Sequence, residues 1–368
     1  MLFTNTIFGG RMKIFVISNM YPSKKYPHYG TFVKHTVSLM RENGIDVDVE
    51  SIQKVDKKWQ KIIIYFRFYL RSIIKLMFSD YEYVYVHYVS HSSLPVLFVS
   101  KIKKMSVIAN VHGNDIVPET DNDKKYLKYS KKILDMSFKV VCPSEYFKKI
   151  LSSEYKVNEK KIVVYPSGGV DTNLFRKIDR GEALKELNLS KNKVYIGYVS
   201  RLEKNKGYDI FLKACYELHK NDKNMNFIVV GDGEEVDKYE ELVDRYHLRE
   251  YIVKYNLLSQ EKLVYLFNAM DVFVFPTYRK SESLGLVGLE AMACETVTVL
   301  PDRYGPTSYS QNGVNSYVFE SKNSEELSKT IEKALNSNND ILCKNAREKA
   351  KEYDSHITDG LLIDIFKS

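Results

Sequence analysis

Residues 194–233 read VYIGYVSRLEKNKGYDIFLKACYELHKNDKNMNFIVVGDG and contain two short apolar runs joined by a segment of helix length. The runs are continuous rather than alternating, which is typical of strands that are buried on both faces. Between them, apolar residues recur at the spacing of one helix face: Ile210, Phe211, Ala214, Cys215 and Leu218. This order predicts two parallel strands joined by a right-handed helical crossover.

The same alternation of strand and helix patterns runs through both halves of the chain. The predicted strands of the first half are KIFVIS, VDVESI, YVYVHYV, SVIANV, KVVCPS and KIVVYPS, and those of the second half are VYIGYVS, NFIVVGDG, YIVKYN, VFVFPT, TVTVLP and SYVF. Helical patterns such as QEKLVYLFNAM separate them. The pattern predicts an α/β protein with parallel sheets that helices cover on both faces.

Two domains are the expected organisation. The chain has 368 residues, more than the ~250 to 300 that one hydrophobic core usually serves. Residues 166–193, rich in Gly, Asp, Asn and Lys, interrupt the strand rhythm. We expect an N-terminal domain over residues 1–175 and a C-terminal domain over 176–355, both doubly wound. Facing domains would place the carboxyl ends of their strands on opposite walls of a deep cleft, where such folds bind ligands.

The composition indicates which kinds of partner the protein binds and in which compartment it lies. The net charge of +8 suits nucleotide phosphates or an acidic membrane surface, and we expect no nucleic-acid partner. The four cysteines form no CxxC pair and have no histidine at metal-ligand spacing, so neither a disulfide framework nor a zinc site is predicted. No run of about 18 apolar residues spans a bilayer. We therefore expect a cytoplasmic protein.

The segment VGDGEE, residues 230–235, follows a predicted strand and invites a dinucleotide-binding interpretation. Gly231 and Gly233 occupy the first two glycine positions, but Val236 stands where the third glycine would be. A redox cofactor site is therefore disfavoured. We expect a tight turn that lets a ligand approach the backbone closely.

Two cations follow the strand VYIGYVS. Arg201 and Lys206 lie just beyond it, and Gly207 opens the next helix. Full charges beside the N–H groups of a helix N-terminus can bind a diphosphate. A solvated basic loop explains the same residues equally well.

The stretch SESLGLVGLEAMA, residues 281–293, carries two glutamates around a glycine-rich segment. A helix should begin near Gly285 and direct its first free N–H groups toward phosphate. Glu282 would lie outside the helix on the loop, as an acid that looks exposed. A capping role would explain Glu282, but it would not explain Glu290 inside an apolar helix.

These segments together resemble a known family. The motifs are Arg201 with Lys206-Gly207, the spacing of Glu282 and Glu290, and the segments VGDG, PSGGVDTNLF, CPSEYFKKIL, VHGND and YGTFVK. With their order along the chain, they resemble the retaining GT-B glycosyltransferases of family 4, also described as glycosyl transferases group 1. The resemblance runs from about residue 13 to the C-terminus.

The resemblance implies a nucleotide-sugar donor in the second domain and an acceptor in the first. Arg201 and Lys206 would hold the donor diphosphate, Glu290 the ribose hydroxyls and Glu282 the sugar. The other donor contacts that it implies are Gly231, Tyr255, Asn256, Leu257 and Leu258 around the nucleotide, and the backbone of Gly285, Leu286 and Val287. UDP-sugar is expected rather than GDP-sugar.

The resemblance also assigns residues of the first domain. His112 matches a histidine that lies near the donor sugar, and Gly30 and Thr31 match the loop that approaches the reaction centre. The helix over about residues 356–368 is expected to pack back on this domain, after a break near Asp354. By the same resemblance, the two domains form a hinge.

The chemistry of these residue types agrees with transfer. Cleavage of a sugar–phosphate bond builds negative charge on the diphosphate, which Arg201, Lys206 and a helix N-terminus would stabilise. No cofactor or divalent ion is then required. In the family the acceptor is thought to attack from the leaving-group face, with a double displacement as the alternative. Glu282 is interpreted as a positioning and electrostatic residue.

Two features qualify the assignment. In members of the family, EAMACG is usually followed by a small residue and a proline. Here Glu295 stands in place of the glycine and Val297 in place of the proline. The pair Asp46 and Asp48 looks like a metal-binding DxD motif. It lies in an alternating strand, however, where both side chains would share one face, most simply toward solvent.

Residues 57–78, KKWQKIIIYFRFYLRSIIKLMF, predict a basic amphipathic helix. Its charged residues are Lys58, Lys61, Arg67, Arg71 and Lys75, and its apolar stripe is Trp59, Ile62, Ile63, Phe66, Leu70, Ile73, Ile74 and Met77. Such a helix can lie in an anionic membrane interface and bring a lipid-linked acceptor to the protein. It can also pack on the sheet with its basic residues in water. Further apolar residues outside the stripe, Ile64, Phe68 and Leu76, favour membrane contact.

The sequence thus predicts a metal-independent retaining glycosyltransferase that moves a sugar from a nucleotide diphosphate to a glycan or lipid-linked glycan, in bacterial surface polysaccharide synthesis. It would be cytoplasmic, with a peripheral position on the inner face of the membrane. The alternatives are a GT-B epimerase or hydrolase acting on the donor alone, and a catalytically silent GT-B subunit that binds a partner glycosyltransferase.

Overall fold

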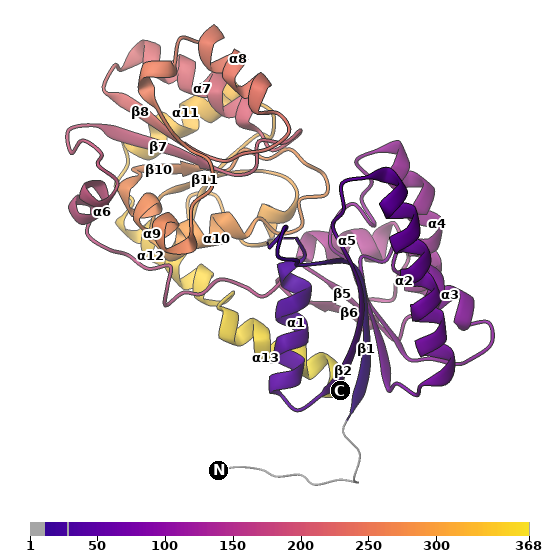
Figure 1. Ribbon diagram of the computed structural model, residues 1–368. Coiled ribbons are helices and arrows are strands. Elements are labelled where there is room, and N and C mark those ends of the chain that lie inside the picture. The colour runs from indigo at the N-terminus through magenta and orange to yellow at the C-terminus, as the bar shows by residue number, and fades with distance from the viewer. Residues whose placement is uncertain (1–11, 28, 368) are drawn as a thin grey trace, which may run out of the picture. The chain divides into compact units, whose positions relative to one another are not determined.

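The computed structural model describes residues 12–27 and 29–367, which fold as two compact units (Figure 1). The first unit comprises the described residues of Met1–Gly168 and Asp359–Ser368, and the second comprises Gly169–Thr358. The sequence placed the junction at residues 175 and 176.

The first unit is built around a six-stranded sheet in the order β2-β1-β3-β4-β5-β6. Every neighbouring pair is parallel. Its elements are β1 (Lys13–Tyr21), α1 (Thr31–Glu42), β2 (Asp46–Gln53), α2 (Lys58–Phe78), β3 (Tyr83–His87), α3 (Ser93–Val99), β4 (Val107–Asn110), α4 (Asp121–Met136), β5 (Lys139–Cys142), α5 (Glu145–Ser153), the 3₁₀ turn η1 (Glu159–Lys161) and β6 (Ile162–Val164). The helix α13 (Ser355–Lys367) begins in the second unit and ends in the first.

The second unit repeats this plan with the strand order β12-β11-β10-β7-β8-β9, again in parallel pairs. Its elements are α6 (Arg180–Glu186), β7 (Val194–Val199), α7 (Tyr208–Asn221), β8 (Met225–Val230), α8 (Val236–Arg245), η2 (Arg249–Tyr251), β9 (Ile252–Tyr255), α9 (Gln260–Ala269), β10 (Val272–Val274), α10 (Leu286–Ala293), β11 (Thr298–Pro301), η3 (Gly305–Ser308), β12 (Tyr317–Phe319), α11 (Ser324–Leu335) and α12 (Asp340–Lys351). The predicted α/β fold with two doubly wound domains is confirmed.

Alternation along the central strands explains the two-sided core. In β1, Phe15 and Ile17 face a cluster with α2, α3, α4 and α5, whereas Ile14 and Val16 face a cluster with α1 and α13. In the second unit, α6, α9, α10 and α12 cover one face of the sheet, and α7, α8 and α11 cover the other. Both sheets are therefore buried on both sides, as the continuous apolar strands predicted.

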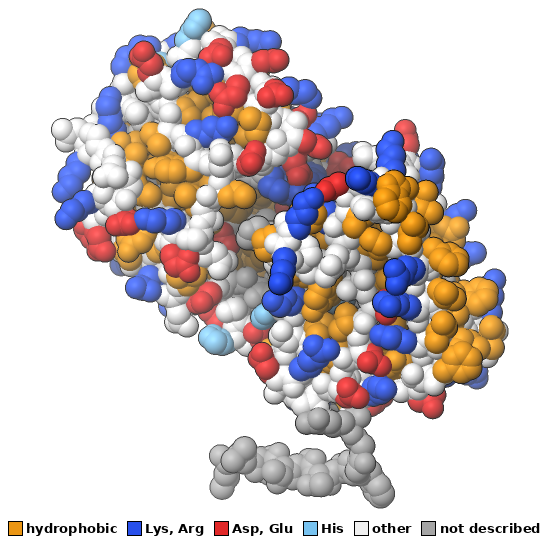
Figure 2. Space-filling model, in the orientation of Figure 1, with side chains coloured by type: hydrophobic (Ala, Val, Ile, Leu, Met, Phe, Trp, Pro, Cys, Tyr) orange, Lys and Arg blue, Asp and Glu red, His pale blue; other side chains and the backbone are white. Residues whose placement is uncertain are grey.

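Helix α2 has two apolar faces. Phe68 and Leu76 are buried in the core, and Ile64 packs against it, so the residues that looked extra in the sequence form the packing face. The opposite face stays in solvent; we call it the outer row of α2, and its members are Trp59, Ile62, Ile63, Phe66, Leu70 and Ile74. Ile73 and Met77, which the sequence assigned to the stripe, pack on the core instead. Figure 2 shows apolar side chains gathered over α2 and the neighbouring α3.

Candidate active site

The loop between β7 and α7 holds Lys206 in one position. Gly207 has φ +85°, and a Cβ atom there would lie 2.0 Å from the carbonyl oxygen of Pro276. Only glycine allows this approach. The loop is thereby held against the end of β10, and Lys206 is buried with 8% of its surface exposed.

Glu282 is the partner of Lys206. Lys206 Nζ donates a hydrogen bond to Glu282 Oε2 at 2.6 Å, and Thr277 Oγ1 donates to the same oxygen at 3.2 Å. Burial alone would raise the pKa of Glu282, but the charge and hydrogen bond of Lys206 outweigh burial and leave the pKa below its usual value. Glu282 looked exposed in the sequence. The structure corrects this, because a lysine 76 residues earlier allows the carboxylate to be buried as an ion.

Arg201 is exposed and forms an ion pair with Glu203. Glu203 also accepts a hydrogen bond from Arg279 Nη1 at 3.3 Å. Arg279 lies in the loop before Glu282, and its charge helps to lower the pKa of Glu282. The sequence identified Arg201 but missed Glu203 and Arg279. Their only signal was their position in polar loops that follow two predicted strands.

Helix α10 begins where the sequence predicted. Gly285 caps it with φ +79°, a conformation that favours glycine, and a Cβ at Gly288 would lie 2.2 Å from the Tyr309 hydroxyl. Among the described residues, the backbone N–H groups of Leu286 and Val287 make no hydrogen bond outside their own helix. The first turn of α10 therefore offers free donors.

Glu290 lies one turn further into α10. Its side chain is half-buried, and within the described part of the chain it has neither an ion-pair nor a hydrogen-bond partner. Burial raises its pKa to about 7. A carboxylate held without a partner in an apolar helix is costly, so it is a candidate for binding a ligand.

The glycines of VGDG are explained by a neighbouring loop. A Cβ at Gly231 would lie 2.0 Å from the carbonyl oxygen of Ser200, and one at Gly233 would lie 2.3 Å from that of Leu202. The close approach is thus between two loops of the protein. It brings the Gly231 turn beside the Arg201 loop at the carboxyl edge of the sheet.

Tyr255 ends β9 at the same edge, and residues 256–258 follow it. Gly231 N donates to the Tyr255 carbonyl oxygen at 2.9 Å. Asn256 and Leu257 are exposed, and Leu258 is half-buried against the core. Arg201, Gly231 and Asn256 therefore lie on segments that follow β7, β8 and β9 at one edge of the sheet, where α/β folds bind ligands.

In the first unit, His112 lies among aromatic rings. Its Nε2 shares a hydrogen bond of 3.0 Å with Nδ1 of His87, and the Tyr88 ring stacks on it with centroids 4.7 Å apart. Burial lowers the pKa of His112 to about 3, so the ring is neutral near pH 7. Asp115 accepts hydrogen bonds from the backbone N–H groups of His112 and Gly113 and shapes this turn.

Gly30 and Thr31 are brought close to His112. Gly30 caps α1 with φ +78°, and a Cβ there would lie 2.8 Å from the backbone of Met20. Thr31 is exposed, and the next residue, Phe32, has its ring centroid 4.6 Å from that of His112. Phe32 thus links the start of α1, which follows Gly30 and Thr31, to the aromatic rings around His112.

Within the described ranges, no group of three or more His, Cys, Asp or Glu side chains could hold a metal ion. Asp48 of the DxD-like pair accepts a hydrogen bond from the Tyr81 hydroxyl at 2.7 Å. No helix among the described residues is long and apolar enough to cross a bilayer.

Family models cover most of both units. A model described as "Glycosyltransferase Family 4" matches residues 35–174, and one described as "Glycosyl transferases group 1" matches residues 179–353. The chain belongs to glycosyltransferase family 4. It is therefore a transferase enzyme with the two-domain GT-B fold.

Relatives of this glycosyltransferase are distant. An uncharacterized glycosyltransferase of Methanocaldococcus jannaschii is 28% identical over 295 residues, covering 77% of this chain and 74% of the relative. A D-inositol 3-phosphate glycosyltransferase of Mycobacterium marinum is 27% identical over 241 residues, covering 62% of this chain and 50% of the relative. The chain therefore matches half the length of that enzyme.

Two solved structures share the fold. A sucrose-phosphate synthase from Thermosynechococcus elongatus has a TM-score of 0.79 and 18% identity, covering 97% of this chain and 98% of the synthase. Anabaena HepE, solved in complex with UDP and glucose, has a TM-score of 0.74 and 16% identity, covering 98% of this chain and all of HepE.

The departure after α10 is accommodated in this glycosyltransferase. Glu295 adopts φ +57°, a conformation that glycine adopts without cost, and its carboxylate pairs with Lys177 at 2.9 Å. Val297 is buried in the core. The turn thus keeps a left-handed residue where the family usually has glycine.

Proposed function

We propose that this enzyme transfers a sugar from a UDP-sugar to a glycan or lipid-linked glycan, with retention of configuration and without a metal ion. Its proposed role is bacterial surface polysaccharide synthesis at the cytoplasmic face of the membrane. The UDP complex of HepE supports the choice of nucleotide. The D-inositol 3-phosphate glycosyltransferases among its relatives support an acceptor that is not itself a nucleotide sugar.

One observation carries the proposal: a buried Lys206–Glu282 pair stands directly before a helix with free N–H groups. In the proposed complex Lys206, Arg201 and the first turn of α10 bind the diphosphate. Glu290 accepts hydrogen bonds from the ribose hydroxyls, and Glu282 orients the sugar.

In the proposed reaction, the acceptor oxygen forms a bond to the anomeric carbon on the face that the diphosphate leaves. The bond between that carbon and the diphosphate oxygen breaks, and the acceptor proton passes to the diphosphate. Fixed positive charges stabilise the developing negative charge without reorganisation. His112, whose pKa of about 3 keeps it uncharged, is suited to a neutral hydrogen bond to the sugar.

Membrane association is proposed through the outer row of α2. Seven large apolar side chains face solvent on this helix, the six of the outer row and Phe78, and Phe98 and Ile102 are exposed on and just after α3. Lys58 and Arg67 are exposed on the same helix. An apolar row with flanking cations matches an anionic lipid interface.

The test is a screen of nucleotide sugars for thermal stabilisation and for diphosphate release, with and without lipid-linked acceptors, in EDTA. Transfer predicts release that depends on acceptor. Turnover without acceptor would identify a donor epimerase or hydrolase instead, and binding without turnover would identify a silent subunit. Loss of activity in EDTA that manganese restores would contradict the metal-independent mechanism.

A further inference from the structure

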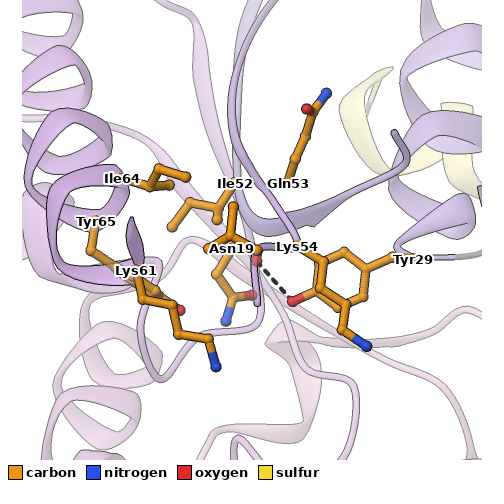
Figure 3. Close-up of a pocket in the computed structure, with 9 residues that line it drawn as sticks. Asn19, Tyr29, Ile52, Gln53, Lys54, Lys61, Ile64 and Tyr65 are labelled. Carbon is orange, nitrogen blue, oxygen red and sulfur yellow. Dashed lines mark hydrogen bonds between the residues drawn. The ribbon is translucent and has the colours of Figure 1, made fainter. Parts of the chain in front are cut away.

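The first unit contains a pocket that His112 does not line, at the carboxyl ends of β1 and β2 (Figure 3). Asn19 and Tyr29 line one side, Lys54 follows β2, and Lys61 and Tyr65 come from the start of α2. The cavity has about 170 Å³, several times the roughly 30 Å³ that one water occupies in the liquid. It can therefore admit a small polar group.

The lining carries positive charge only. Lys54 and Lys61 are exposed, and within residues 12–27 and 29–367 neither ammonium forms an ion pair. Lys54 Nζ lies 4.9 Å from the centre of the Tyr26 ring. Asp56, whose charge interacts with that of Lys54, lies outside the lining and is hydrogen-bonded to Lys25 and to the Tyr26 hydroxyl. Two cations in a pocket lining that holds no carboxylate favour an anion.

The pocket also carries unused hydrogen-bonding capacity. The Asn19 side chain hydrogen-bonds Tyr65, while its Oδ1 is buried and has no partner among the described residues. Such an orphaned acceptor is rare in folded proteins. The Tyr29 hydroxyl is within 3.4 Å of the Asn19 carbonyl oxygen, and burial raises the pKa of both Tyr29 and Tyr65, so both phenols stay protonated. In Figure 3 the Asn19 amide lies between Lys61 on one side and Tyr29 and Lys54 on the other.

We infer that this pocket binds the phosphate of a phosphorylated sugar, through Lys54 and Lys61, with Asn19 accepting a hydrogen bond from a sugar hydroxyl. This inference rests on the proposed function, in which the first unit binds the acceptor, and it names the chemical class of that acceptor. A soluble sugar phosphate and a lipid-linked sugar phosphate share this chemistry. The outer row of α2 starts beside the pocket, because Lys61 lies between its first two members, Trp59 and Ile62.

The experiment measures binding to the full chain by calorimetry at fixed ionic strength. Glucose 6-phosphate and glucose test the soluble source, and farnesyl phosphate and farnesol test the lipid source. Each pair differs only by the phosphate. We expect a phosphorylated probe to bind at least about tenfold more tightly than its unphosphorylated counterpart, as a charge-assisted contact predicts.

Two variants of the pocket and one control variant test whether the phosphorylated probe binds there. Lys54→Gln with Lys61→Gln should weaken the phosphorylated probe at least about tenfold. Asn19→Asp, which keeps the shape and adds a negative charge, should weaken it similarly. Lys131→Gln with Lys132→Gln removes two exposed lysines of α4 in the same unit and should leave affinity unchanged.

Two results would overturn the inference. One is that neither phosphorylated probe binds more tightly than its unphosphorylated counterpart. The other is that the α4 control loses as much affinity for the phosphorylated probe as the pocket variants do. UDP-sugar binding is measured in parallel and should be the same in all variants, because the proposed donor site belongs to the second unit. A protein that binds the phosphorylated probe but no UDP-sugar would contradict the proposed function instead.

Discussion

At the scale of single residues, the buried pair of Lys206 and Glu282 depends on both partners. Lys206→Ala would remove the main compensation for a buried carboxylate, so we expect the free energy of unfolding of the second domain to fall by about 3–5 kcal/mol. Lys204→Ala, an exposed change in the same loop, should stay within about 0.5 kcal/mol. Urea denaturation measures both, and equal effects would show that the pair is not coupled.

The pair also carries a pH dependence. Because the pKa of Glu282 is lowered in the folded state, its stabilising contribution is present at neutral pH. It is lost as the pH falls through that lowered pKa.

Glu290 should make donor binding depend on pH. Its pKa of about 7 means that the carboxylate is mostly protonated at pH 6 and mostly ionised at pH 8. An ionised carboxylate accepts hydrogen bonds from both ribose hydroxyls, whereas the diphosphate of a UDP-sugar keeps its charge over this range. We expect UDP-sugar affinity to rise about tenfold between pH 6 and pH 8.

The control for this profile is a pair of isosteric changes. Glu290→Gln should flatten the profile, and Glu250→Gln, an exposed change before β9, should keep it. A profile that Glu290→Gln leaves unaltered would remove Glu290 from the donor site.

At the scale of elements, α2 is expected to mediate membrane binding. Phe66→Ser with Ile62→Ser removes two exposed apolar side chains, each worth roughly 1.5–3 kcal/mol when buried. We expect sedimentation with phosphatidylglycerol vesicles at low salt to fall at least tenfold. Ile341→Ser changes a similarly exposed apolar side chain on α12 and should have no effect. Wild-type protein that fails to sediment would exclude the membrane proposal.

Periodicity could predict α2 as a helix but not its packing face. Both of its faces are apolar, and only the tertiary contacts of Phe68 and Leu76 decide which is buried. For α10 the local signals were sufficient, because Gly285 and the following helix formers specify the start directly. The burial of Glu282 was not predictable in this way, since its partner comes from a distant loop.

At the scale of the whole molecule, the C-terminal residues complete the first unit. Leu362 and Phe366 of α13 are buried in its core, although the chain reaches them only after the second unit. Phe366→Ala should destabilise the first unit by about 3–5 kcal/mol without changing UDP-sugar affinity. Leu361→Ala on the same helix, at a side chain that is 41% exposed, should cost far less. Thermal unfolding with and without donor separates the two units, and a loss of donor affinity in Phe366→Ala would contradict their independence.

The strands were predictable throughout because parallel sheets demand continuous apolar runs, and all twelve predicted runs coincide with strands of the structure. The site was predictable only in part. Arg201, Lys206 and Glu290 lie in recognisable segments, whereas Glu203 and Arg279 matter through contacts between loops far apart in the sequence. The pocket around Asn19 is likewise assembled from four separate segments.

A crystal structure of the protein with UDP tests the central claim most directly. We predict the diphosphate against Lys206, Arg201 and the first turn of α10, with the ribose hydroxyls within hydrogen-bond distance of Glu290. UDP bound away from α10, or a ribose that does not contact Glu290, would contradict the proposed donor site.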